Sequence, residues 1–174
     1  MVLLQGSDYL LFVVLLMALI WDIRFNKLPN WLTAGAMILG ILYHLIMSGI
    51  DGLVFSFIGL LAGGGIFLIL YLFKAIGAGD VKLFAAIGAI TGVPMVFYFM
   101  MYSVVFAGVI GIILLLFMKT FLRNFLNMLF NFVNSLPSGK LKDLREFDIN
   151  KTTRFPFMYA VIPAVIVTYY YNFM

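Results

Sequence analysis

Cysteine is absent from this chain of 174 residues, and histidine occurs once. The absence of cysteine excludes disulfide bonds, thiolate nucleophiles and cysteine-based zinc sites. A single histidine also argues against a histidine-based metal site, so we expect neither a metal nor a cofactor. Charged residues make up only 10% of the chain, whereas hydrophobic residues make up 65%. A soluble domain with a hydrated surface cannot be built from this composition, which predicts that most of the surface faces lipid.

Six apolar runs follow one another along the sequence, separated by polar interruptions. A membrane-spanning helix needs about 20 mainly apolar residues, and helices are expected because lipid offers the backbone no hydrogen-bonding partners. The first run is not typical of a cleavable signal peptide, since no basic segment precedes it and Asp22 and Arg24 follow it. The predicted spans are residues 9–21, 31–47, 53–73, 81–91, 95–118 and 155–173.

All eleven lysines and arginines fall on the connections that follow the first, third and fifth spans or, for Lys82, within two residues of such a connection. The N-terminus, the other two connections and the C-terminal tail contain none. The positive-inside rule therefore predicts a multi-pass membrane protein with both termini outside and the basic connections in the cytoplasm. The net charge of +4 is thus a topology signal. We expect no nucleic-acid partner, whereas a basic cytoplasmic rim favours membrane lipid.

The only long polar interruption begins with residues 119–136, where apolar side chains recur at helical spacing opposite Arg123 and four asparagines. This pattern predicts an amphipathic helix lying in the membrane interface. The alternative is a cytoplasmic continuation of the fifth helix that packs on other helices. A charged cytoplasmic loop is expected to follow, up to residue 154. We therefore expect residues 1–174 to form a single membrane-embedded domain, an all-α polytopic protein of about six transmembrane helices plus one interfacial amphipathic helix.

Four aspartates border the predicted helices, and an acid in a membrane helix is informative because it costs about 2.5 to 3.5 kcal/mol at the bilayer centre on insertion scales. Asp8 and Asp51 lie at the outer ends, where a solvated carboxylate or a helix cap explains them. Asp22 and Asp80 differ, because they lie at the inner ends of the first and fourth helices. The predicted topology places these two acids at one membrane depth on one side.

Two carboxylates that meet at one site have a recognised chemical use. They cannot both ionise at contact distance, so they share a proton. One acid then acts as a base toward water, while the other donates a proton to the scissile carbonyl oxygen. This is aspartyl protease chemistry, which needs neither metal nor cofactor. The alternative is that each acid only caps its helix or pairs with a nearby base, Arg24 or Lys82.

Two glycines, Gly77 and Gly79, precede Asp80 at the predicted start of the fourth helix. Glycine allows positive φ and lets another chain approach closely. A protease requires such a close approach if it must hold an extended peptide against its acid. The position of the motif at a helix start, at the depth of a second aspartate, makes it more informative than the same letters in a soluble protein.

The sequence Gly-Ala-Gly-Asp-Val-Lys-Leu at residues 77–83 resembles the G-x-G-D signature of type IV prepilin peptidases, of the related preflagellin peptidases and, more distantly, of presenilin-like proteases. Asp22, together with Leu-Pro-Asn-Trp-Leu-Thr at residues 28–33, is similar to that family's first catalytic aspartate and the segment after it. Arg-Phe-Pro-Phe at residues 154–157 resembles the basic, proline-containing start of the family's last helix. The resemblance covers about residues 9–164.

The resemblance implies a membrane aspartic endopeptidase of a bacterial or archaeal inner (plasma) membrane, which removes the short basic leader of prepilins or pilin-like proteins at the cytoplasmic membrane face. It implies Asp22 and Asp80 as the catalytic pair. For the basic residues of the motifs, anchoring at the inner membrane face is an equally good explanation. Further motif residues are candidates for shaping the site or binding substrate: Gly77, Gly79, Arg24, Pro29, Asn30 and Lys82.

The chain departs from the larger members of that family, which carry an inserted cytoplasmic domain with paired Cys-x-x-Cys motifs and also N-methylate the new amino terminus. Nothing between Asp22 and Trp31 could hold such a domain, and cysteine is absent. We therefore expect no methyltransferase activity. The chain resembles the minimal, peptidase-only branch that serves tight-adherence or Flp-type pili.

Other functions stay open at this point. A small proton-coupled transporter or channel could use two acids to relay protons, but it would favour acids near the middle of the membrane. A related G-x-G-D protease could act on preflagellin or competence pseudopilins. A non-catalytic assembly factor could retain the fold, although both acids are present. His44, well inside the second span, is interpreted as a packed polar residue rather than a catalyst.

Overall fold

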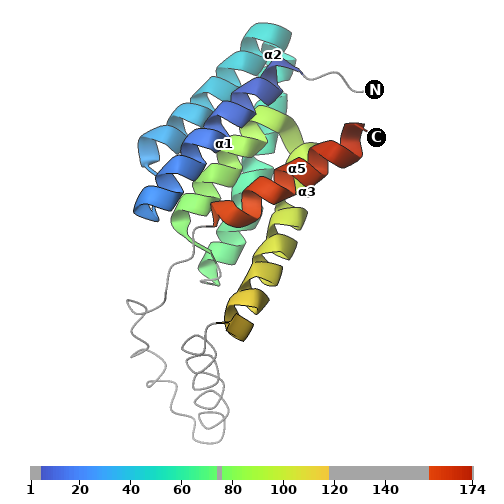
Figure 1. Cartoon of the computed structure of the whole chain (residues 1–174). Helices are drawn as coiled ribbons and strands as arrows, with labels where there is room; N and C mark the ends of the chain where they lie inside the picture. Colours follow the sequence, from blue (N-terminus) through green and yellow to red (C-terminus); the bar gives the residue numbers. More distant parts are fainter. Residues whose placement is uncertain (1–4, 74–75, 118–156, 174) are drawn as a thin grey trace, which may run out of the picture. The chain divides into compact units, whose positions relative to one another are not determined.

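The computed structural model describes residues 5–73, 76–117 and 157–173, and these residues are helical almost throughout. The prediction of an all-α protein is confirmed for them. The predicted interfacial helix and charged loop, within residues 119–154, lie outside the described residues. The described helices are α1 (Gly6–Phe25), α2 (Asn30–Leu72), α3 (Ala78–Phe117) and α5 (Met158–Phe173), labelled in Figure 1.

Among the described residues, three helices are long and apolar enough to cross a membrane. They are Gly6–Phe25, Asn30–Leu72 and Ala78–Ile113, whereas α5 is a shorter apolar helix. The count of six crossings stays a prediction. The chain divides into two compact units, Met1–Ala107 with Pro156–Met174, and Gly108–Phe155. The contacts below belong to the first unit.

Helix α2 folds back on itself at Gly49, whose φ of 61° and ψ of −137° leave the helical region. A side chain at this positive φ would be strained, so glycine is needed at the turn. After the turn Gly52 reaches the backbone of His44, and a Cβ at Gly52 would overlap with the His44 carbonyl. Helix α2 thus consists of two helical segments, residues 30–48 and 50–72, and the break falls inside the interruption that the sequence predicts.

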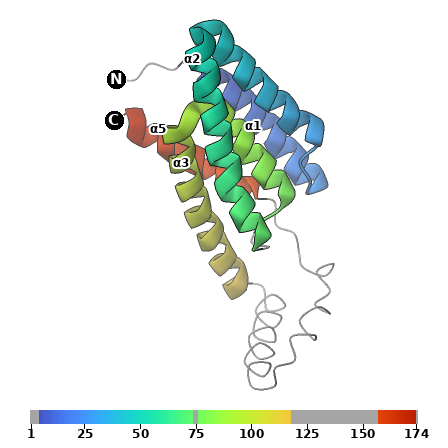
Figure 2. The same ribbon diagram turned by 180° about the vertical axis from the view of Figure 1, so that it is seen from behind.

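Helix α3 bends at Gly92, which has a φ of 75° and is followed by Pro94 (Figures 1 and 2). Proline has no N–H to donate to the carbonyl four residues earlier, which is that of Ile90. His44 Nε2 donates to this oxygen instead, at 2.8 Å. Ser56 Oγ donates to the carbonyl one residue before it, at 2.6 Å. Side chains from both halves of α2 therefore hold the bend.

The second half of α2 crosses the first half of α3 with backbone against backbone. A Cβ at Gly59 would overlap with the Gly88 carbonyl, and a Cβ at Gly88 would overlap with that of Gly59. Gly63 meets the Phe84 carbonyl in the same way. Small residues at this spacing let two membrane helices approach closely. The buried residues of this half of α2 are Gly52, Ser56, Gly59, Gly63 and Phe67.

Helix α1 packs against α2 and α5. Near its start, Asp8 Oδ2 accepts a hydrogen bond from the Gln5 N–H at 2.7 Å, which caps the helix as the sequence suggests. Asp8 Oδ1 accepts a second bond from the hydroxyl of Tyr169 in α5, at 2.6 Å. The other end of α1 meets the start of α5, so the two helices run in opposite directions.

The helix crossing predicts a difference between two glycines of the same helix. Gly59→Ala forces a Cβ into the Gly88 carbonyl, and we expect it to destabilise the protein by about 1 to 3 kcal/mol. Among the described residues, a Cβ at Gly65 meets no atom within 4 Å. Gly65→Ala is therefore the matched control, and we expect it to cause no loss of stability. Thermal unfolding of the two purified variants in detergent gives the melting temperature of each. Equal melting temperatures for the two variants would contradict the close crossing.

Candidate active site

Asp22 belongs to the buried face of α1. The buried residues of this helix recur every three or four positions, as expected for one face. Asp22 is only 6% exposed. The helix ends one turn later, because Asn26 adopts the left-handed conformation, with a φ of 50°, and donates its N–H to the Asp22 carbonyl oxygen at 2.8 Å. The buried residues are Ser7, Leu11, Val14, Leu15, Ala18 and Asp22.

The buried carboxylate of Asp22 has a partner in the last described helix. Its Oδ2 accepts a hydrogen bond from the backbone N–H of Met158, at 3.1 Å. Met158 is the first residue of α5. A helix start carries free N–H groups and the positive end of the helix dipole, so it favours a negative charge beside it.

Asp80 is the third residue of α3, and its carboxylate is held at the start of that helix. Its Oδ2 accepts a hydrogen bond from the Gly77 N–H at 3.0 Å, while its own N–H donates to the Gly77 carbonyl at 3.1 Å. The side-chain bond is one half of a capping box, and the backbone bond stands where the side chain of an N-cap residue would make the other half, because glycine has none. Unlike Asp22, Asp80 is only partly buried.

The start of α3 lies against the connection between α1 and α2. A Cβ at Gly79 would lie 3.4 Å from the Leu28 Cβ. Lys82 Nζ donates to Asn30 Oδ1 at 2.8 Å. Asp22 and Asp80 are close enough for their charges to interact. The structure therefore brings the two acids to the same end of the bundle.

The other predicted site residues of the α1–α2 connection have structural contacts. Pro29 is the N-cap of α2, and its carbonyl accepts the N–H groups of Leu32 and Thr33 at 3.2 and 3.4 Å. Asn30, the first residue of α2, is held by Lys82. These contacts fix where α2 begins, and through Lys82 they tie it to the helix of Asp80.

Arg24 is exposed on the last turn of α1, and its guanidinium lies over the ring of Phe25, 5.6 Å from the centroid. Trp21 lies 5.5 Å from Trp31 and 5.6 Å from Phe25, measured between ring centroids. Aromatic and basic side chains at a helix end are typical of anchoring at a membrane interface. The geometry thus favours an anchoring role for Arg24.

A sequence model of the type IV leader peptidase family matches residues 9–112, more than half of the 174 residues. The chain belongs to the type IV leader peptidase family. Membership makes it a protease, broadly of the aspartic type, whose general class of substrate is a pilin-like precursor. Together with its apolar helices, it also indicates an integral membrane protein. No curated protein and no solved structure matches the chain significantly.

Two features near the acids of this peptidase were missed by sequence reasoning. One is the Met158 N–H, which is a backbone group 136 residues away from Asp22. The other is a cluster of aromatic rings, in which Phe67 stacks on Phe84 at 3.9 Å and both approach Phe157. The proline-containing segment before α5 indicated a helix start, but nothing local indicated which acid that start would meet.

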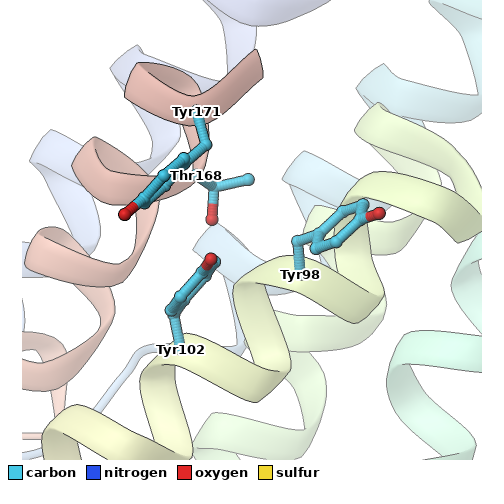
Figure 3. Close-up of a pocket in the computed structure, with 4 residues that line it drawn as sticks. All are labelled: Tyr98, Tyr102, Thr168 and Tyr171. Atoms are coloured by element: carbon cyan, nitrogen blue, oxygen red, sulfur yellow. The ribbon is translucent and has the colours of Figure 1, made fainter. Parts of the chain in front are cut away.

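A cavity of about 150 Å³ lies between the second half of α3 and α5 (Figure 3). Its lining combines hydroxyl groups with aromatic rings, and the rings of Tyr102 and Tyr171 are nearly parallel, 6.5 Å apart. Neither acid lines it, so it is separate from the candidate site. The lining residues are Tyr98, Tyr102, Thr168 and Tyr171.

The contact between Gly77 and Asp80 predicts a loss of activity from one methyl group. A Cβ at Gly77 would lie 3.1 Å from Asp80 Oδ2, so Gly77→Ala crowds the carboxylate. A shift of about 1 Å in a reacting group can cost about 10²-fold, and we expect peptidase activity to fall by about tenfold or more. Gly35→Ala is the control, because among the described residues a Cβ there meets no atom within 4 Å. Equal cleavage rates for both variants at matched membrane levels would contradict this reasoning.

Proposed function

We propose that this peptidase is a membrane aspartyl endopeptidase that removes the short basic leader of type IV prepilins or pilin-like proteins at the cytoplasmic membrane face, with Asp22 and Asp80 as the catalytic pair. The observation that carries the proposal is the placement of two carboxylates from separate helices at one end of the bundle, close enough for their charges to interact. The family match supports the reaction class, and both acids lie within the matched residues.

The two acids differ in burial and in their hydrogen-bond partners. Asp22 is buried and held by an amide, whereas Asp80 is partly exposed at a helix start. Water and a peptide can therefore reach the pair from the side of Asp80. One carboxyl group takes a proton from the attacking water while the other donates a proton to the carbonyl oxygen of the scissile bond. Two acids that share a proton titrate as a pair, so we assign these roles to the pair rather than to either residue.

The glycines before Asp80 leave room for a substrate backbone. Gly77 is exposed and Gly79 is partly exposed, and neither presents a side chain beside the acid. An extended peptide can approach a glycine backbone more closely than any other. Lys82 is engaged with Asn30 and holds the site together, so we assign it a supporting role rather than direct substrate binding.

The membrane orientation is part of the proposal. The described basic residues near the acids are Arg24, Lys27 and Lys82, whereas the opposite end carries Asp8 and Asp51. Basic residues concentrate on the cytoplasmic side of membrane proteins. We therefore propose that the acids face the cytoplasm, that both termini lie outside, and that residues 1–174 form one membrane-embedded peptidase domain. A proton-coupled transporter is not favoured, because the chain is a leader peptidase by family and its paired acids share one end.

The catalytic proposal predicts that Asp22→Asn and Asp80→Asn each lower cleavage by about 10³-fold or more, because removing one member of a catalytic unit disables the whole. Each variant is co-expressed with a pilin precursor that carries a short basic leader, and leader removal is followed by mass spectrometry. Asp51→Asn is the matched control, since Asp51 is an exposed acid at the opposite end. Full processing by either dyad variant at a normal membrane level would exclude the proposed mechanism.

The orientation can be tested directly because the chain has no cysteine of its own. Single cysteines are introduced by Lys27→Cys, beside the acids, and by Asp51→Cys, at the other end; both positions are exposed. A membrane-impermeant maleimide added to intact cells should label position 51 alone, and position 27 only after the membrane is opened. The opposite labelling pattern would place the acids outside and contradict the cytoplasmic site.

A further inference from the structure

The start of α5 is defined by its first hydrogen bonds. The Phe157 carbonyl accepts the N–H groups of Ala160 and Val161 at 2.9 and 3.3 Å. Phe157 is therefore the N-cap and Met158 the first helical residue. The N–H of that residue has no acceptor within its own helix. It donates instead to Asp22 Oδ2, on a different helix.

Aromatic packing fixes the place of this helix start. The Phe157 ring lies 6.2 Å from that of Phe67 and 6.3 Å from that of Phe84, measured between centroids. Phe84 follows Asp80 by four residues, so both lie on the same face of α3. Phe67, Phe84 and Met158 are fully buried. The start of α5 thus contacts the helix of each acid, through a hydrogen bond to α1 and through ring packing on α3.

A hydrogen bond to one carboxylate oxygen also orients the other. With Oδ2 of Asp22 held by the amide, sharing a proton with Asp80 falls to Oδ1. The Asp22 side chain is buried, and inside a protein a hydrogen bond to a charged group is stronger than in water. A rigid backbone donor costs no reorganisation during the reaction, unlike a donor on a long side chain.

We propose that the N-terminus of α5 is a positioning element of the active site, in which the Met158 N–H holds the Asp22 carboxylate in the orientation needed to meet Asp80. The inference rests on the proposed catalytic role of Asp22. It adds a helix that the family match does not include, because the match ends at residue 112. The group that acts is a backbone amide, so the identity of residue 158 matters only where it removes that amide.

The test uses the tolerance of helices for proline at their first position, where the ring fits the backbone and only the N–H is lost. Met158→Pro removes the donor, whereas Met158→Ala shortens the same buried side chain and keeps the donor. We expect kcat of the proline variant to lie about ten- to hundredfold below that of the alanine variant, as for the loss of a hydrogen bond to a charged group. KM should agree within about twofold, because the amide does not touch the substrate.

A second measurement does not depend on catalysis. Asp22→Ala is combined with each substitution at Met158, and thermal unfolding is followed in detergent. If the hydrogen bond exists, Asp22→Ala changes the melting temperature differently in the two backgrounds, because the contact is already lost in the proline variant. Equal changes, or equal kcat values for the proline and alanine variants, overturn the positioning role. A failure of the proposed function would instead appear as full processing by Asp22→Asn.

Discussion

The structure depends on one constraint: a polar group inside an apolar bundle must find its partner within the protein. Lipid offers no hydrogen bonds, and an unsatisfied backbone group there costs several kcal/mol. The bundle satisfies Asp22 with an amide of α5 and satisfies the Ile90 carbonyl with His44. The same requirement that stabilises the fold therefore also orients the buried acid of the proposed dyad.

Glycine determines how closely the helices that carry the site can approach. The Gly59–Gly88 crossing sets the first half of α3 directly on α2, and Asp80 lies two turns from that crossing on the same helix. At the end of the bundle away from the acids, Gly49 and Gly92 adopt positive φ at the two sharp bends. The bends and their hydrogen bonds gather at one end of the bundle, whereas the acids and the described basic residues gather at the other. The glycine bends and the acids therefore occupy opposite ends of the bundle.

The family match and the structure describe different extents of the same site. The match covers residues 9–112, which contain both acids, the two glycine bends and the helix crossing. The start of α5 lies beyond it, yet it makes a hydrogen bond to Asp22 and ring contacts with Phe67 and Phe84. A peptidase core of α1 to α3 can therefore be recognised by sequence alone, while a contact that holds one acid comes from a later helix.

The sequence by itself indicated a membrane protein, because hydrophobic residues and charges can be counted along the chain without knowledge of its fold. It determined the helical form, the breaks near Gly49 and Gly92, and the choice of Asp22 and Asp80 as the acids of interest, each at a helix end. Short motifs around those acids also indicated the family, and the family match confirmed it.

Only the tertiary structure decided which groups these residues meet. The partners of His44, Lys82 and Asp22 lie 46, 52 and 136 residues away along the chain. Two of those partners are backbone groups, which every residue possesses, so no pattern of side chains could indicate them. Such contacts follow from the angles at the glycine bends and from the packing of rings, and these are set by the whole bundle at once rather than by any one segment.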